Sequence, residues 1–155
     1  MELTVRQFFD AGRTVLELGV VAGQDHLDRT IREIAINRPG LALAGFFQYF
    51  ARHRIQVIGL AEIAYLKSLS EDERRVRLRR FFQKQIPCVV ITRSRQAFDE
   101  MIQMAETFKV PILKTPLVTG RFINASTLIM KNLTSPRMRV QGTMVDIMGI
   151  GVLLE

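Results

Sequence analysis

Few side chains in this sequence have the types and spacing that catalysis needs. The sequence contains two histidines, His26 and His53, and one cysteine, Cys88, and no cluster of acids or further histidines stands near them at metal-ligand spacing. Both histidines stand in polar stretches near turn residues, which favours a surface or capping role. Cys88 stands inside the apolar stretch 86–91, which predicts a buried and unreactive thiol. These residues therefore predict no catalytic site and no metal site.

The glycine pair Gly149 and Gly151 is the pattern nearest to a nucleotide-binding loop. A dinucleotide-binding fingerprint needs a third glycine and a following helix, and both are missing here. A phosphate-binding loop needs the pattern G-x-x-x-x-G-K-[ST], which occurs nowhere in the 155 residues. The residues alone therefore predict no cofactor-binding site in this chain.

The net charge of +7 raises the question of a nucleic-acid partner. Much of this charge comes from the stretch 73–82, which reads ERRVRLRRFF. We interpret this stretch as a helix whose arginines face solvent and whose Val76, Phe81 and Phe82 point inward. A surface for an acidic partner is the alternative. Specific nucleic-acid binding is disfavoured, because no recognised motif and no interleaved aromatic residues accompany the arginines.

Segments typical of helices and strands alternate along the sequence. Thr4 and Gln7 predict a capping box for a helix over 5–11, Ser70 and Glu73 predict a second one before a helix from 71, and Ser94 is the expected cap of a helix over 95–108. The other expected elements are strands over 15–21, 30–36, 55–58, 86–92 and 110–114, a short helix within 41–50, and helices over 61–69 and 116–133. Strands that alternate with helices from position 55 onward predict βαβ units and a mostly parallel sheet. Residues 1–133 are thus expected to form one α/β domain.

The last stretch, 140–155, reads VQGTMVDIMGIGVLLE and carries eight large apolar side chains between positions 144 and 154. This density predicts a strand buried on both faces. Exposure of all eight would cost on the order of 10–20 kcal/mol, against a typical domain stability of about 5–15 kcal/mol. We therefore interpret residues 134–155 as a linker and the first strand of a domain that is mostly missing. An orphan strand of this kind is expected to pair with another chain in a homo-oligomer.

The stretch VDIMGIGVLLE (145–155) resembles the strand that leads into the phosphate-binding loop of the bacterial HPr kinase/phosphorylase family, with the pattern V-D-hydrophobic-x-G-x-G-V-L. The resemblance continues in Asn37–Gly59, Ser68–Phe82 and Ile86–Arg93 and covers nearly the whole chain. It implies that residues 1–133 are the family's N-terminal domain, similar in fold to the N-terminal domain of the muramyl ligases. Residues 134–155 would be the linker and first strand of the C-terminal kinase domain, ending just before its phosphate-binding loop.

Proteins of this family phosphorylate and dephosphorylate a serine on the phosphocarrier HPr with ATP and magnesium, and they assemble as hexamers. The resemblance therefore implies a regulatory or assembly domain, with HPr as partner of the full-length enzyme and with ATP and Mg²⁺ bound by the missing C-terminal domain. Gln141 stands where the family commonly has a histidine near the active site. A glutamine cannot exchange a proton near neutral pH, which weighs against the phosphorylase direction or the usual substrate.

A ligand-sensing module without catalysis is the alternative, since regulatory domains are related to this fold. In that case Arg38 and Gly40, in the loop 38–40, and Thr119 and Arg121, at the start of a helix, would form an anion site from exposed amides and arginine. The sequence has no basic run before an apolar core at its N-terminus and no apolar run approaching 18 residues, which predicts neither a signal peptide nor a membrane span. A single cysteine suits a reducing cytoplasm.

Overall fold

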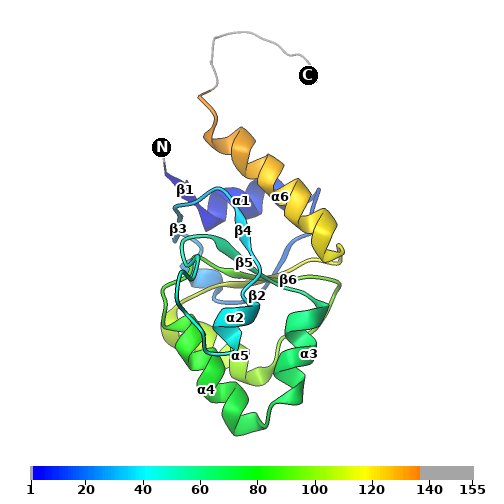
Figure 1. Cartoon of the computed structure of the whole chain (residues 1–155). Helices are drawn as coiled ribbons and strands as arrows, with labels where there is room; N and C mark the ends of the chain where they lie inside the picture. Colours follow the sequence, from blue (N-terminus) through cyan, green and yellow to red (C-terminus); the bar gives the residue numbers. More distant parts are fainter. Residues whose placement is uncertain (1, 137–155) are drawn as a thin grey trace.

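A computed structural model describes residues 2–136 and has a five-stranded sheet at its centre (Figure 1). The strand order is β2 (Gly19–Ala22), β7 (Ile112–Lys114), β6 (Val89–Ile91), β5 (Ile55–Ile58) and β4 (Ile36–Asn37). Strands β4, β5, β6 and β7 run parallel, whereas β2 is antiparallel to β7. Two short strands, β1 (Leu3–Thr4) and β3 (Thr30–Ile31), pair separately. The predicted α/β fold with a mostly parallel sheet is confirmed.

Helices cover both faces of this sheet (Figure 1). One layer contains α2 (Gly40–Leu43), α3 (Leu60–Ser68), α4 (Glu71–Phe82) and α5 (Asp99–Phe108). The opposite layer contains α1 (Val5–Gly12) and α6 (Thr119–Thr134), which contact each other. A 3₁₀ turn, η1, spans Gln24–His26. The helices between β4 and β7 thus lie on one face, and α1 and α6, from the two ends of the described chain, lie on the other.

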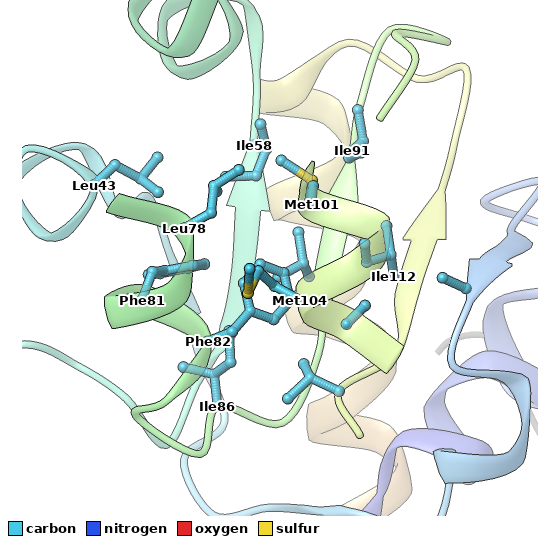
Figure 2. Packing of buried hydrophobic residues seen from close by; sticks show 14 of the residues in the cluster. Leu43, Ile58, Leu78, Phe81, Phe82, Ile86, Ile91, Met101, Met104 and Ile112 are labelled. Atoms are coloured by element: carbon cyan, nitrogen blue, oxygen red, sulfur yellow. The ribbon is translucent and has the colours of Figure 1, made fainter. Parts of the chain in front are cut away.

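The central strands are buried on both sides, which explains their unbroken apolar sequences. Ile58 and Ile91 pack with α4 and α5, in the cluster that Figure 2 shows around Leu78, Phe82 and Met101. Ile55 and Val57 of β5, Val90 of β6 and Cys88 just before β6 point to the opposite face and pack with α1 and α6. Alternation along each strand therefore supplies two separate cores from one sheet.

Local capping signals were reliable at two helix starts. The Thr4 hydroxyl accepts a hydrogen bond from the Gln7 amide at 3.1 Å, and the Gln7 side chain accepts one from the Thr4 amide at 2.9 Å. The Ser70 hydroxyl accepts a hydrogen bond from the Glu73 amide at 3.1 Å. Helices α1 and α4 therefore begin where the sequence predicts.

Several local predictions were wrong. The expected strand over 15–21 begins only at Gly19, as β2, and residues 13–17 form turns. Helix α5 begins at Asp99, and Ser94 lies in a left-handed conformation (φ 56°) with its amide donating to the carbonyl oxygen of Thr115 at 3.1 Å. The expected strand over 30–36 is divided into β3 and β4, which belong to different sheets. Val76 is 56% exposed, and Leu78 occupies the inward position on α4 instead.

The expected C-terminal strand over 140–155 lies outside the described residues. Within residues 2–136, no helix combines the length and the apolar character that a membrane crossing requires.

Candidate functional site

Polar side chains gather at the carboxyl ends of the parallel strands. Arg38 follows β4, Glu62 lies in the first turn of α3 after β5, Thr92 follows β6, and helix α6 brings Thr119 to the same edge. In open sheets of parallel strands, ligands bind at this edge because loops and helix starts converge there. The edge is therefore the candidate functional site.

An ion pair between Arg38 and Glu62 joins β4 to α3 at this edge. The Arg38 Nη2 lies 2.9 Å from Glu62 Oε1, and Arg38 Nε lies 3.1 Å from Oε2, so the guanidinium binds the carboxylate through two hydrogen bonds. The Gly59 amide also donates to Glu62 Oε1, at 2.8 Å. The Glu62 side chain is 6% exposed, whereas that of Arg38 is 46% exposed. The carboxylate is thus satisfied from within the domain.

These contacts shift the pKa of both groups. Burial opposes the charged form of Glu62, but the hydrogen bonds from Arg38 and from backbone amides outweigh it and hold the pKa of Glu62 below its ordinary value. The hydrogen bond to Glu62 raises the pKa of Arg38. Both groups therefore stay charged at neutral pH.

Gly59 allows the start of α6 to approach β5 closely. A Cβ at position 59 would lie 2.6 Å from Thr119 Oγ1 and 3.0 Å from Arg38 Nη2. The Thr119 hydroxyl is 2.7 Å from the Thr92 hydroxyl, and both residues are buried. Hydrogen bonds therefore join the loops after β4 and β5 through Arg38, Glu62 and the Gly59 amide, and join the loop after β6 to the start of α6 through Thr92 and Thr119.

A pocket of about 550 Å³ lies at the same edge, beyond β6 and β7. The loop after β6 forms one wall with Ser94, Arg95, Gln96 and Ala97, and the other lining residues are Glu17, Val21, Asp99, Ile102, Lys114, Thr115 and Pro116. The lining contains two basic residues, Arg95 and Lys114, and two acidic residues, Glu17 and Asp99. Its apolar residues are Val21, Ala97, Ile102 and Pro116. The pocket thus has the size and mixed polarity of a small-molecule site.

The structure brings only some of the predicted site residues together. Arg38 and Thr119 both adjoin Gly59, but their polar groups already bind Glu62 and Thr92. Gly40 and Arg121 are exposed, and a Cβ at Gly40 would meet no atom within 4 Å. These four residues stay a predicted anion site.

Sequence reasoning missed Glu62, Thr92 and the pocket. Glu62 stands three residues after Gly59, which is the spacing of a capping box and the one local signal available. The predicted burial of Cys88 is confirmed, since the thiol is fully buried and burial raises its pKa to about 12. Gln141 lies outside the described residues.

The described residues do not fit the magnesium and ATP that the family resemblance implies. Within residues 2–136, no three His, Cys, Asp or Glu side chains come together as metal ligands. The Glu62 carboxylate is bound by Arg38 and by a backbone amide, and both threonine hydroxyls bind each other. We therefore derive no step of phosphate transfer from this part of the chain.

Comparison with known proteins identifies the domain. Residues 3–130 match the family model described as the HPr Serine kinase N terminus. The chain belongs to this family. The matched range of the HPr serine kinase N-terminal domain contains both helix layers up to Met130 and the whole carboxyl-edge site, so the resemblance found in the sequence is confirmed.

Two curated relatives from the same family are similar to this chain in sequence. The HPr kinase/phosphorylase of Caldicellulosiruptor bescii is 43% identical over 128 residues, which are 82% of this chain and 41% of the relative. That of Brevibacillus brevis is 37% identical over 135 residues, 87% of this chain and 43% of the relative. The chain thus spans about two fifths of the length of these relatives.

Comparison with solved structures gives a weak match to one regulatory protein. It contains the CBS and DRTGG domains of the regulatory region of Clostridium perfringens pyrophosphatase, in complex with the activator diadenosine tetraphosphate. The match has a TM-score of 0.48 and 13% sequence identity, and it covers 79% of this chain and 45% of that one.

Replacing Glu62 by glutamine is expected to lower the free energy of unfolding by about 1–2 kcal/mol near neutral pH, because Arg38 loses a charged acceptor. The pKa of Glu62 is lower in the folded state, so its contribution is complete above the ordinary value of 4.5 and is lost as the pH falls through the folded pKa. The variant is expected to lack this part of the acid destabilisation. Denaturant unfolding at a series of pH values measures both effects.

Glu71→Gln is the matched control, because Glu71 is an exposed glutamate 3.6 Å from Arg75 on α4. This change is expected to cost less than about 0.5 kcal/mol. Equal losses in the two variants would contradict the assigned role of the Arg38–Glu62 pair.

Proposed function

We propose that this chain is the N-terminal regulatory or assembly domain of an HPr serine kinase/phosphorylase-like protein. The family match over residues 3–130 carries the proposal, together with relatives named HPr kinase/phosphorylase of which the chain spans about two fifths. In this proposal, ATP- and magnesium-dependent phosphorylation of a serine on HPr belongs to the C-terminal remainder of a cytoplasmic full-length enzyme. Residues 134–155 connect the two parts, and the full-length enzyme is a homo-oligomer.

The geometry supports a role in holding other domains or copies of the protein together. Both faces of the sheet are covered by helices, and each face has its own closed set of buried side chains. The buried polar groups at the carboxyl edge have partners within the domain: Glu62 binds the half-exposed Arg38, and Thr92 binds Thr119. A domain built in this way offers stable outer surfaces to other domains or copies.

Calorimetric titration of the 155-residue chain with ATP and magnesium tests whether nucleotide binding belongs to the C-terminal remainder of the enzyme. We expect no binding heat, because residues 2–136 contain no cluster of metal ligands and the 155-residue sequence contains no phosphate-binding loop of the pattern G-x-x-x-x-G-K-[ST]. The full-length relative from C. bescii is the positive control. Micromolar binding by the chain alone would contradict the proposal.

Light scattering tests the assembly role. The chain has a mass of 17.7 kDa, and we expect a multiple of this mass at high protein concentration. A strict monomer over the whole accessible concentration range would contradict an assembly role for this domain.

The pocket of about 550 Å³ favours a second candidate, a ligand-sensing module. A thermal-shift screen of small anionic and zwitterionic metabolites would reveal a ligand as a rise in Tm. The rise is expected to shrink in a Lys114→Met variant, since Lys114 lines the pocket, and to persist in Lys131→Met, since Lys131 lies on α6 outside the lining. A uniform response of both variants would contradict binding at this pocket.

A further inference from the structure

Another pocket, of about 410 Å³, lies at the amino ends of the parallel strands, opposite the candidate site. Its lining residues come from β3 and from the segments before β4, β5 and β6: Arg29, Thr30, Arg32, Arg52, His53, Gln85 and Pro87. Three of them are arginines, and none of these lining residues is acidic. A cleft lined by charges of one sign concentrates ligands of the opposite sign.

The half-buried Arg29 has no counterion within the domain. Its Nε donates to the carbonyl oxygen of Ile86 at 3.0 Å, its Nη1 to that of Lys109 at 3.3 Å, and its Nη2 to Gln85 Oε1 at 3.4 Å. All three acceptors are uncharged, and no carboxylate of residues 2–136 lies within 4.0 Å of Arg29. A guanidinium has five N–H donors, so two of them have no acceptor in this part of the chain.

A comparison with Arg38 shows what Arg29 lacks. The hydrogen bond from Arg38 to the Glu62 carboxylate raises the pKa of Arg38. For Arg29, burial is the main effect and lowers the pKa. The group still stays protonated at neutral pH, and charges that leave water are normally paired with an opposite charge. An anion in the pocket would supply that charge.

The other two arginines of the pocket are also available to an anion. Arg52 Nη1 donates to the carbonyl oxygen of Lys84 at 3.1 Å, which is an uncharged partner. Arg32 Nη1 lies 4.0 Å from Glu2 Oε2, and the two side chains are 61% and 72% exposed. An exposed contact of this length contributes little, so a ligand can displace it.

Neighbouring carboxylates are bound to other arginines. Asp28 pairs with Arg6 at 2.8 Å, and Glu33 pairs with Arg54 at 2.8 Å. Neither acidic residue lines the pocket. The positive charge of the pocket is therefore not neutralised by these neighbours.

We propose that this pocket binds a small oxyanion with two negative charges between the guanidinium groups of Arg29, Arg32 and Arg52. Guanidinium groups bind phosphate, sulfate and carboxylate oxygens through paired, charge-assisted hydrogen bonds. The volume of about 410 Å³ is near the lower end of the range for small-molecule sites, about 300–1,000 Å³, which favours a compact anion.

This site differs from the places at the carboxyl edge where a ligand could bind. Arg38 is already bound by Glu62, and the pocket of about 550 Å³ has two acidic residues beside its two basic ones. The amino-end pocket has basic lining residues and no acidic one, so it repels an anion least. The inference does not depend on the assembly role proposed above.

Calorimetric titration of the 155-residue chain with sodium phosphate, sodium sulfate and sodium succinate at pH 8 tests the proposal. The ionic strength is kept constant with NaCl, so that general screening does not change. We expect saturable binding of at least one of these dianions at one site, and weaker binding of the singly charged acetate. A preference for phosphate and sulfate would identify a tetrahedral ligand group, and a preference for succinate a dicarboxylate. No saturable binding of any of the three dianions would overturn the proposal.

Arginine variants test the location of the site. Arg29→Met is expected to abolish measurable binding, because it removes the half-buried charge. Arg52→Met is expected to weaken binding about tenfold, because it removes one charged donor. Arg52 is exposed, so this second variant keeps the test valid if loss of the three hydrogen bonds of Arg29 prevents folding.

Arg95→Met is the matched control. Arg95 is exposed, has no ion-pair partner within 4.0 Å in the stretch 2–136, and lies in the loop after β6 at the other end of the sheet. The change lowers the net charge by the same amount and is expected to alter the affinity by less than about twofold, because the solvent screens distant charges. Unchanged affinity in Arg52→Met, or equal weakening in Arg52→Met and Arg95→Met, would overturn the assigned site.

Discussion

Replacing Leu78 by alanine is expected to lower the free energy of unfolding by about 2–5 kcal/mol, whereas Val76→Ala lowers it by less than about 0.5 kcal/mol. The two residues are two positions apart on α4, but Leu78 is fully buried and Val76 is mostly exposed. Leu78 belongs to the cluster with Phe82 and Met101 (Figure 2), where truncation leaves a cavity. Denaturant unfolding of both variants at low protein concentration measures the difference.

The comparison determines the orientation of α4. Similar losses for the two variants, or a larger loss for Val76→Ala, would mean that the helix is rotated relative to the sheet. Such a rotation would also turn Asp72, Val76 and Arg80, which are exposed, toward the sheet. Leu128→Ala, at an exposed position of α6, is a control for the loss of a leucine side chain alone and is expected to be near neutral.

Replacing Gly23 by alanine is expected to lower the free energy of unfolding by about 2–4 kcal/mol. Gly23 follows β2 and has a φ of 72°, a conformation that costs a residue with a Cβ about 1–3 kcal/mol. The added Cβ would also lie 2.8 Å from Pro111 Cα and 3.0 Å from the carbonyl oxygen of Val110. These are backbone atoms before β7, so they cannot rotate away, and overpacking adds to the conformational cost.

Gly40→Ala is the matched control for this change. A Cβ at Gly40 would meet nothing within 4 Å, and its φ lies outside the left-handed region. The substitution is expected to be neutral or slightly stabilising, because alanine favours helix and reduces the freedom of the unfolded chain. Comparable losses at Gly23 and Gly40, read from thermal or denaturant unfolding, would contradict the close approach of β2 to the segment before β7.

The sequence predicted the structure correctly where the outcome depends on residues close together in the chain, or where an apolar segment has to be buried. Thr4 and Ser70 were found as caps because a cap involves residues three apart. The bounds of strand β5 were predicted correctly, because a short apolar run between turn residues is too short for a helix and is typical of a buried strand. The parallel sheet followed from the alternation of such runs with helices.

Errors arose where distant residues decide the outcome. Ser94 looks like a cap, but its amide bonds to Thr115 of the segment after β7, which delays the helix to Asp99. Val76 and Leu78 are both apolar residues among arginines, and only packing against the α5 layer selects Leu78. Local patterns cannot contain this information.

The same limit applies to the candidate site. Arg38 and Glu62 are 24 residues apart, and Thr92 and Thr119 are 27 apart, so both pairs depend on how the strands align. Sequence reasoning selected Arg38 and Thr119 as exposed ligands for an anion. It did not foresee that each would have a partner from another loop.

The chain changes from one face of the sheet to the other between α5 and α6, and this separates the end of α6 from the α4 layer. Helix α6 ends at Thr134 in the layer opposite α4 (Figure 1). The whole thickness of the sheet therefore separates the end of α6 from the outer surface of α4. A molecule bound on the α4 layer would therefore contact neither α1 nor α6, and only the loops at the edges of the sheet could be reached from both layers.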